Sequence, residues 1–267
     1  MKTVGIIGNG FVGNAIYENF KTRVTTKVFD VDPNKTVDSF DQVIGSDIIF
    51  VCLPTPMMKG GECDVSYVEK FFNTVPTVNG LFVLKSTVPI GTMSRLCAER
   101  SDIRIIHNPE FLTADNAKED FFNCDRNVIG GLDSNTKELE TFLYEIFPEW
   151  EGVPCYRVSS TQSEIIKYFS NSFLAVKVAY FNNVYQTCKA LGVDYEIVRD
   201  AITEDERIGK RHTKVPGLDG KLGFGGYCFP KDINALIHSL NNLNIDSELL
   251  KSAWNYNVKV RGEYESI

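Results

Sequence analysis

The sequence predicts an α/β fold, a Rossmann-type doubly wound parallel sheet followed by an all-helical central domain with a long helix. Three observations lead to this prediction. Short apolar runs alternate with helical stretches through the first half of the chain, and a glycine-rich turn follows the first apolar run. Residues 160–191 contain no Gly or Pro, and apolar side chains recur along them at helical spacing.

The expected strands are short and continuously apolar, as is typical of a parallel sheet that helices cover on both faces. They lie at residues 3–8, 27–30, 46–53, 80–86, 103–107 and 125–131. A helix is expected from about Val12 to Asn19, directly after the first strand.

The second half of the chain is expected to be helical. The stretch 160–191 is apolar over more than one stripe, so we expect this helix to be buried against two partners. Shorter helices are expected at 195–203, 232–243 and 247–261. A stretch with Pro and Gly precedes the long helix, which places a Rossmann-like domain at 1–155 and a helical central domain at 156–267.

Composition excludes several classes of protein. The 267 residues carry a formal net charge of -7, which argues against a general affinity for nucleic acid or anionic membranes. We find no apolar run long enough to span a membrane and no secretory signal at the N-terminus. The seven cysteines include no CxxC pair, so we expect neither a disulfide framework nor a bound metal, and we expect a cytoplasmic location.

A GxGxxG fingerprint begins at Gly8, directly after the first expected strand and at the start of a helix. Gly8 permits the tight turn, Gly10 lets the backbone approach a pyrophosphate, and Gly13 lets helix and strand pack closely. Asp30 ends the next expected strand and would accept hydrogen bonds from the ribose hydroxyls, which favours NAD over NADP. A non-binding glycine turn is the alternative, and Asp32 could share the ribose role.

Cys228 lies among glycines just ahead of an expected helix start, with Pro230 well placed for that start. A helix N-terminus and the nearby Lys231 would favour the thiolate, so this cysteine could attack a carbonyl carbon. An inert packing cysteine is the alternative, and it is our default for the other six.

Four further side chains are candidates for the chemistry. Lys167 and Asn171 lie at i, i+4 on the long helix and could donate together to one oxyanion, unless they are a solvated surface pair. Thr87 and Glu110 each follow an expected parallel strand and should therefore face the cofactor cleft. The alternatives are a turn or cap for Thr87 and a solvated loop carboxylate for Glu110.

Taken together, these segments resemble the UDP-glucose/GDP-mannose dehydrogenase family. The resemblance is spread over nearly the whole chain, and its most specific part is the segment around Cys228. The matching segments are Gly8–Gly13, Leu53–Pro56, Ser86–Pro89, Asn108–Leu112, Glu164–Asn171, Arg207–Gly209 and Gly223–Asp232.

The resemblance implies a four-electron oxidation of the C6 alcohol of a nucleotide sugar, above all UDP-glucose to UDP-glucuronate, with NAD as the cofactor. Cys228 would form a thiohemiacetal and then a thioester. Lys167 and Asn171 would stabilise the oxyanion, and Asp232 would hold Lys167 and a water. Thr87 would lie near that water.

The resemblance also implies that Glu110 acts in thioester hydrolysis and that Arg207 reaches the substrate of a neighbouring subunit in a homodimer. The implied cofactor-binding residues are Gly8, Gly10, Phe11, Val12, Gly13, Asp30, Pro54, Thr55, Ser86 and Thr87. The implied substrate-binding residues are Glu110, Phe111, Leu112, Lys167, Asn171, Arg207, Phe224, Gly225 and Lys231. A role in polysaccharide biosynthesis would fit such a product.

The sequence departs from the family's pattern in three places. Ala114 and Asp115 stand where the family has a Glu-Gly pair, and the bulky Tyr227 stands at a position that is usually small. The chain ends at Ile267, so we expect a short form without the family's third domain. The alternatives are a non-catalytic or partner-dependent protein that binds NAD or a nucleotide sugar, and a two-electron dehydrogenase of the hydroxyacid type.

Overall fold

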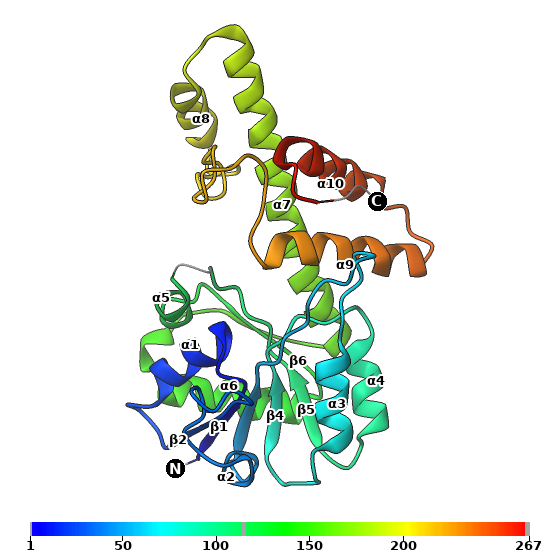
Figure 1. Cartoon of the computed structure of the whole chain (residues 1–267). Coiled ribbons are helices and arrows are strands. Elements are labelled where there is room, and N and C mark those ends of the chain that lie inside the picture. Colours follow the sequence, from blue (N-terminus) through cyan, green and yellow to red (C-terminus); the bar gives the residue numbers. More distant parts are fainter. Residues whose placement is uncertain (1, 114–115, 265–267) are drawn as a thin grey trace. The chain divides into compact units, whose positions relative to one another are not determined.

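The computed structural model describes residues 2–113 and 116–264 (Figure 1). The chain divides into two compact units. The first comprises Met1–Pro56 and Asp64–Lys167, and the second comprises Met57–Cys63 and Tyr168–Ile267. The domain boundary expected near residue 155 stays a prediction.

The first unit is built on a seven-stranded sheet with the strand order β2-β1-β3-β4-β5-β6-β7. The strands are β1 (Val4–Ile7), β2 (Thr26–Phe29), β3 (Ile48–Val51), β4 (Leu81–Leu84), β5 (Arg104–His107), β6 (Asn127–Gly130) and β7 (Cys155–Val158). From β1 the chain adds β2 on one side and then β3 on the other, so the topological switch point lies between β1 and β3. Ligands of such sheets bind beyond the carboxyl ends of the strands at this point.

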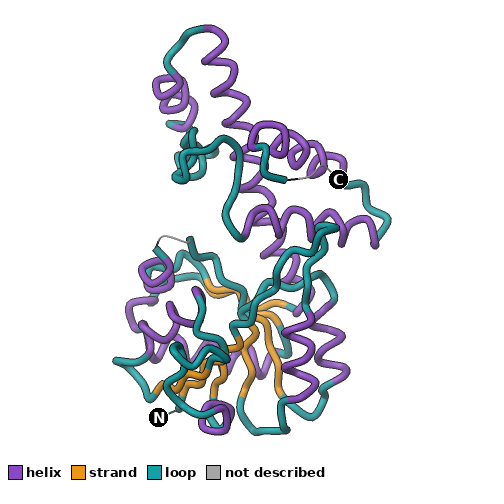
Figure 2. Tube along the Cα trace, in the orientation of Figure 1, coloured by secondary structure: helices purple, strands orange, loops and turns teal. Residues whose placement is uncertain are grey.

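Helices cover both faces of the sheet, as Figures 1 and 2 show. One hydrophobic core lies under α1, α5 and α6, and a second lies under α2, α3 and α4. The bounds are α1 (Phe11–Phe20), α2 (Phe40–Ile44), α3 (Ser66–Thr74), α4 (Thr92–Glu99), α5 (Ala117–Phe122), α6 (Asp133–Ile146) and the short 3₁₀ helix η1 (Pro148–Trp150). The predicted fold class is confirmed.

Two details of the predicted sheet were wrong. The sheet is not wholly parallel, because β6 pairs antiparallel with β5, and β7 then runs parallel to β6. The 19 residues between β5 and β6, which include the short helix α5, are long enough for a parallel crossover, so the length of the connection does not reveal the reversal. Strand β7 itself was not predicted, because its residues are half-buried or exposed and form no apolar run.

The second unit is helical, with α7 (Ser160–Leu191) beginning in the first unit and continuing through the second. The other helices are α8 (Tyr195–Thr203), α9 (Cys228–Asn242) and α10 (Glu248–Arg261). A small core of Phe181, Cys188, Tyr195 and Val215 ties α7 to α8 and to the chain that follows.

Helix α9 begins at Cys228, four residues before the expected start at Asp232. Pro230 therefore lies inside the first turn, where a missing backbone N–H costs no helical hydrogen bond. The expectation that the long helix is buried on all its apolar stripes is not met within the chain. Phe173 and Tyr180 of α7 are 67% and 63% exposed.

Among the helices that the structure describes, none combines the length and the apolar character needed to cross a membrane.

Candidate active site

The glycine turn after β1 has the geometry that a pyrophosphate-binding loop requires. Gly8 has φ +87°, and a Cβ there would lie 2.4 Å from the carbonyl oxygen of Cys52 at the end of β3. A Cβ on Gly13 would lie 1.8 Å from the carbonyl oxygen of Gly8, so only glycine lets α1 pack on this turn. At Gly10, in contrast, an added Cβ would meet no atom within 4 Å, which leaves the backbone accessible.

Asp30 closes the turn against the end of β2. Its carboxylate accepts hydrogen bonds from the backbone N–H of Asn9 at 2.6 Å and of Asp32 at 2.8 Å. These bonds hold the carboxylate beside the glycine turn, where the sequence predicts a ribose contact. Asp32 instead accepts from Asn34 in its own turn.

Two further segments of the predicted cofactor site meet beyond the ends of β3 and β4. The Ser86 hydroxyl donates to the carbonyl oxygen of Leu53 at 2.6 Å, which joins the start of the Leu53–Pro56 segment to Ser86 and Thr87. Thr55 and Thr87 are both buried, so Thr87 is not an exposed turn residue.

The residues present fit a dinucleotide. The side-chain oxygen Oδ1 of Asn9 is buried in the turn and has no hydrogen-bond partner among the described residues. Together with the open backbone at Gly10 and the first N–H groups of α1, this acceptor lies where a pyrophosphate and ribose would bind. Phe11 and Val12 form the first turn of that helix.

Gly10→Ala and Gly13→Ala should separate cofactor binding from folding. The Gly13 variant should lose about 1–3 kcal/mol of stability, because its methyl group collides with backbone. The Gly10 variant should unfold like the wild type yet bind NAD about tenfold more weakly, because its methyl group occupies the pyrophosphate approach. Thermal unfolding and calorimetric titration with NAD measure the two effects. Unchanged NAD affinity in Gly10→Ala would contradict the assignment of this turn.

Lys167 and Glu110 form a buried ion pair within the first unit. The Lys167 ammonium donates to the Glu110 backbone carbonyl and lies 3.1 Å from its carboxylate Oε1, and the two side chains are 2% and 9% exposed. The other carboxylate oxygen accepts from the backbone N–H of Leu112 at 2.6 Å. This geometry excludes the alternatives of a solvated lysine and a solvated loop carboxylate.

The ring of Phe111 is contacted by two cations. The Arg126 guanidinium lies 4.1 Å from its centroid, and the Lys167 ammonium lies 5.1 Å from it. Both cations attract the π face of the ring, so they fix the loop that carries Glu110.

A second buried lysine, Lys85, anchors the start of the loop that carries Glu110. The Lys85 ammonium donates to Asn108 Oδ1 at 2.7 Å, and Asn108 donates in turn to the carbonyl oxygen of Val128 at 2.7 Å. Burial lowers the pKa of Lys85 to about 8. The network joins the ends of β4 and β5 to β6, at the point where the loop that carries Glu110 begins.

In the second unit, Cys228 is half-buried and is the first residue of α9. No side chain caps this helix end, and Cys228 lies in its first turn, where the helix dipole is positive. Burial raises the pKa of Cys52 and Cys155 to about 12 and that of Cys124 to about 11, which holds these three as inert thiols. Cys228 differs from these three cysteines because it is the first residue of a helix.

The loop that leads to Cys228 is anchored by two asparagines. Asn182 of α7 accepts from the backbone N–H of Gly223 at 2.8 Å, while Asn257 of α10 accepts from the N–H of Phe224 at 2.7 Å and donates to its carbonyl. Gly223 has φ +72°, and a Cβ there would lie 2.2 Å from Asn257 Oδ1. This rigid loop carries Phe224 and Gly225 toward α9.

Asp232 lies at the centre of a buried cluster in the second unit. Its carboxylate accepts from the side-chain amide of Asn171 at 2.5 Å and pairs with the Lys231 ammonium. Burial opposes the charge on Lys231, but Asp232 prevails and raises the Lys231 pKa. Asn171 is buried, so the alternative of a solvated surface position is also excluded for it.

Arg207 is 88% exposed and pairs with Asp205, two residues before it. Tyr227 is also exposed. Ala114 and Asp115 lie outside the described residues.

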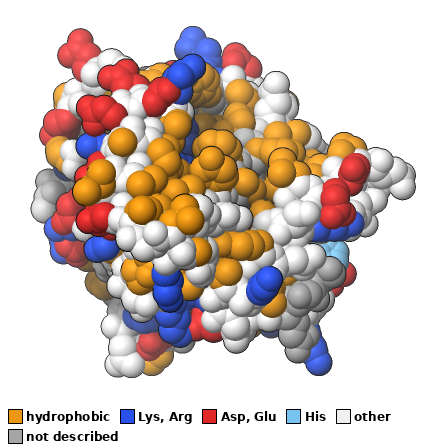
Figure 3. All heavy atoms as spheres, turned by 90° about the horizontal axis from the view of Figure 1, so that it is seen from above, with side chains coloured by type: hydrophobic (Ala, Val, Ile, Leu, Met, Phe, Trp, Pro, Cys, Tyr) orange, Lys and Arg blue, Asp and Glu red, His pale blue; other side chains and the backbone are white. Residues whose placement is uncertain are grey.

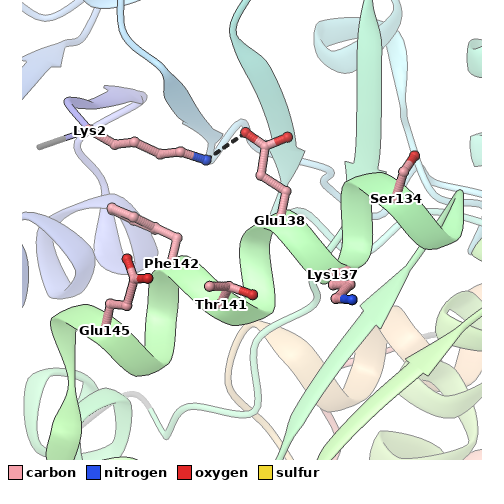
Figure 4. Close-up of a pocket in the computed structure, with 7 residues that line it drawn as sticks. All are labelled: Lys2, Ser134, Lys137, Glu138, Thr141, Phe142 and Glu145. Carbon is pink, nitrogen blue, oxygen red and sulfur yellow. Dashed lines mark hydrogen bonds and ion pairs between the residues drawn. The ribbon is translucent and has the colours of Figure 1, made fainter.

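The pocket drawn in Figure 4 is a different feature, of about 340 Å³, and none of the predicted site residues lines it. Its lining comes mainly from α6, with Lys2 and Glu138 paired at 2.7 Å. Lys2 precedes β1, so this pocket lies at the amino end of that strand, opposite the glycine turn.

Two family models match the chain. The NAD binding domain of the UDP-glucose/GDP-mannose dehydrogenase family matches residues 15–148, and the central domain of the same family matches residues 161–259. The chain belongs to the UDP-glucose/GDP-mannose dehydrogenase family. NAD is the cofactor that this family's N-terminal domain binds, as the fingerprint predicted.

Individual members of this dehydrogenase family are similar to the chain. A UDP-glucose 6-dehydrogenase of Rickettsia conorii is 35% identical over 246 residues, which is 89% of this chain and 55% of that protein. A second, of Bacillus subtilis, is 36% identical over 217 residues, or 78% of this chain and 47% of that protein. The chain thus spans about half the length of the curated relatives it matches. The structure of a UDP-glucose dehydrogenase from Pyrobaculum islandicum has a TM-score of 0.83 at 29% identity, covering 97% of this chain and 68% of that one.

Four residues that hold the site in place are not among those predicted from the sequence. Lys85, Arg126, Asn182 and Asn257 contact segments that carry predicted site residues. Asn182 and Asn257 each have a second asparagine close by, Asn183 and Asn255, so the sequence pattern does not single them out. Nothing in the spacing distinguishes Lys85 or Arg126.

Proposed function

We propose that this protein is an NAD-dependent nucleotide-sugar 6-dehydrogenase that oxidises the C6 alcohol of UDP-glucose to the carboxylate of UDP-glucuronate. The observation that carries the proposal is the pair of buried polar clusters, Lys167 with Glu110 and Asn171 with Asp232, on a chain that belongs to this family. Burying four such side chains is costly, and catalysis gives a reason to retain them.

Bound NAD would supply the hydride acceptor for both oxidations. The glycine turn and Asp30 would hold it, with Pro54, Thr55, Ser86 and Thr87 beyond the neighbouring strands. Lys167 and Asn171 would donate to the oxygen of the reacting carbon as negative charge develops there. The proton of the alcohol would pass to a water held by Asp232, and the Thr87 hydroxyl would assist this transfer.

The Cys228 thiol would add to the aldehyde carbon, giving a thiohemiacetal whose second oxidation leaves a thioester. Water then breaks the carbon–sulfur bond, with Glu110 as the base, so that the product is a carboxylate and the thiol is restored. One sugar, two NAD and one water thus give one uronate, two NADH and three protons. Phe111, Leu112, Phe224, Gly225 and Lys231 would contact the substrate.

We further propose a homodimer in the cytoplasm. The second unit leaves large apolar side chains exposed, and Figure 3 shows hydrophobic side chains gathered across one face. The exposed residues of α7 and α8 include Phe169, Phe173, Tyr180, Leu191 and Ile197. An apolar surface of this kind is typical of an interface. In a dimer, Arg207 would reach the substrate of the neighbouring subunit. Light scattering tests the dimer, because it measures the mass of the protein in solution.

The function is tested with the purified chain, NAD and a panel of UDP- and GDP-sugars, with NADH absorbance as the readout. We expect turnover with UDP-glucose and little with sugars whose C6 carries no hydroxyl. NAD binding without turnover on any nucleotide sugar would contradict the proposal and support the alternative of a binding protein.

A further inference from the structure

The carboxylate of Glu164, near the start of α7, is fully buried in the first unit and takes no part in the steps above. One oxygen accepts a hydrogen bond from the backbone N–H of Gly91 at 2.7 Å. The other accepts from the backbone N–H of Met93, also at 2.7 Å. Both donors belong to the start of α4, so the carboxylate joins two helices that are far apart in the sequence.

Helix α4 needs this acceptor. Its N-cap is Gly91, with φ +95°, so it has no side chain to cap the helix, and the first turn contains no acidic residue. The first N–H groups of a helix require acceptors, and its positive end favours an anion. Glu164 supplies both from a different helix.

The same short stretch of α7 also holds the other end of this segment. Ser163 lies 2.8 Å from His107 Nδ1, and His107 Nε2 lies 3.3 Å from the carbonyl oxygen of Ser86. Residues 86–93, which include Thr87, are therefore held at one end by Glu164 directly and at the other end by Ser163 through the ring of His107. Lys167 follows Glu164 by one helical turn.

We propose that Glu164 is a positioning residue for Thr87: it holds segment 86–93 in register with the turn of α7 that carries Lys167. The inference rests on the proposed function, because Thr87 and Lys167 are the groups that it would align. Both must lie within a few tenths of an ångström of their working positions for proton transfer.

The charge state of Glu164 gives the proposal a distinct signature. Burial raises the pKa of Glu164 to about 7, although the N–H groups of Met93 and Gly91 oppose the shift. Two titratable groups lie nearby. Burial and then Glu164 raise the pKa of Cys97 on α4, and burial lowers that of His107 on β5 to about 3. Both neighbours therefore remain neutral near pH 7.

The sign of the pH effect follows from linkage. While Glu164 holds segment 86–93, its carboxyl binds a proton more tightly than it does when the segment has opened. In the opened state the Glu164 carboxyl regains an ordinary pKa of about 4.3. The free energy of opening is therefore largest at acid pH, falls as the pH rises toward about 7, and levels off above it.

The test is amide hydrogen exchange at Gly91 and Met93 in the full chain, at about pH 6 and about pH 8, corrected for intrinsic rates. In the wild type, protection should fall roughly tenfold between the two pH values. Glu164→Gln, which preserves shape, should show no such dependence, and Glu164→Ala should lose protection at both. Glu69→Gln is the matched control. Glu69 also pairs with α4, through Arg95 at 2.5 Å, but on the exposed side of that helix.

Turnover gives the second readout. Glu164→Gln should lower kcat about tenfold and raise the KM for NAD by a smaller factor, because Ser86 and Thr87 lie in the segment that Glu164 holds whereas the glycine turn and Asp30 do not. Wild-type protection and pH dependence in Glu164→Gln would overturn the inference. The predicted exchange pattern in a chain that turns over no nucleotide sugar would instead contradict the proposed function and support the holding role of Glu164.

Discussion

Replacing Cys228 with serine should lower steady-state NADH formation roughly a thousandfold, because the aldehyde can no longer be held as a thiohemiacetal for the second oxidation. The first oxidation does not need the thiol, so a burst of at most one NADH per active site should remain. The substitution replaces sulfur with oxygen at the first residue of α9 and leaves the anchors at Asn182 and Asn257 untouched. Stopped-flow absorbance resolves the burst from the steady state.

Cys155→Ser is the matched control. Cys155 is also half-buried, but burial raises its pKa to about 12, so it should play no part in the chemistry. The control should retain turnover within about twofold. If Cys228→Ser matched this control, the plain two-electron dehydrogenase would be the better account.

Lys167→Met should have the second largest effect, a fall in kcat of about a hundredfold to a thousandfold, as is usual when a donor to a developing oxyanion is removed. It should also lower the free energy of unfolding by about 3–5 kcal/mol, because Glu110 would be left as a buried carboxylate without its cation. Denaturant unfolding and steady-state kinetics on the same preparation measure both.

A double variant separates the two effects. Lys167→Met combined with Glu110→Gln leaves no buried charge at this position, so most of the lost stability should return. Turnover should not return, because Asn171 alone remains as a donor to the oxyanion and the hydrolytic base is missing. Restored turnover in the double variant would show that Lys167 serves stability alone.

The fold was predictable where a single local signal decided it. The apolar runs gave the strands of the buried sheet, and α7 and α8 have the predicted bounds because no Gly or Pro interrupts them. Strand β7 and the direction of β6 were not predictable in this way. The exposed side chains of β7, at the edge of the sheet, form no apolar pattern, and the buried apolar run of β6 is the same whichever way the strand runs.

The candidate site was predictable by residue type but not by environment. Lys167 and Asn171 were correctly placed on one helix, yet spacing could not tell a buried ion pair from a solvated one. Glu164 was missed as a separate feature because a lone carboxylate on a helix has no local signal. Its role comes from two backbone N–H groups more than 70 residues earlier in the chain.

The most direct test of the whole account is the number of NADH molecules formed for each UDP-glucose consumed when the reaction runs to completion. Sugar and uronate are quantified by chromatography, and NADH is quantified by absorbance. The four-electron route through Cys228 predicts two NADH and one UDP-glucuronate for each UDP-glucose. One NADH with an aldehyde product, or no NADH at saturating NAD, would contradict it.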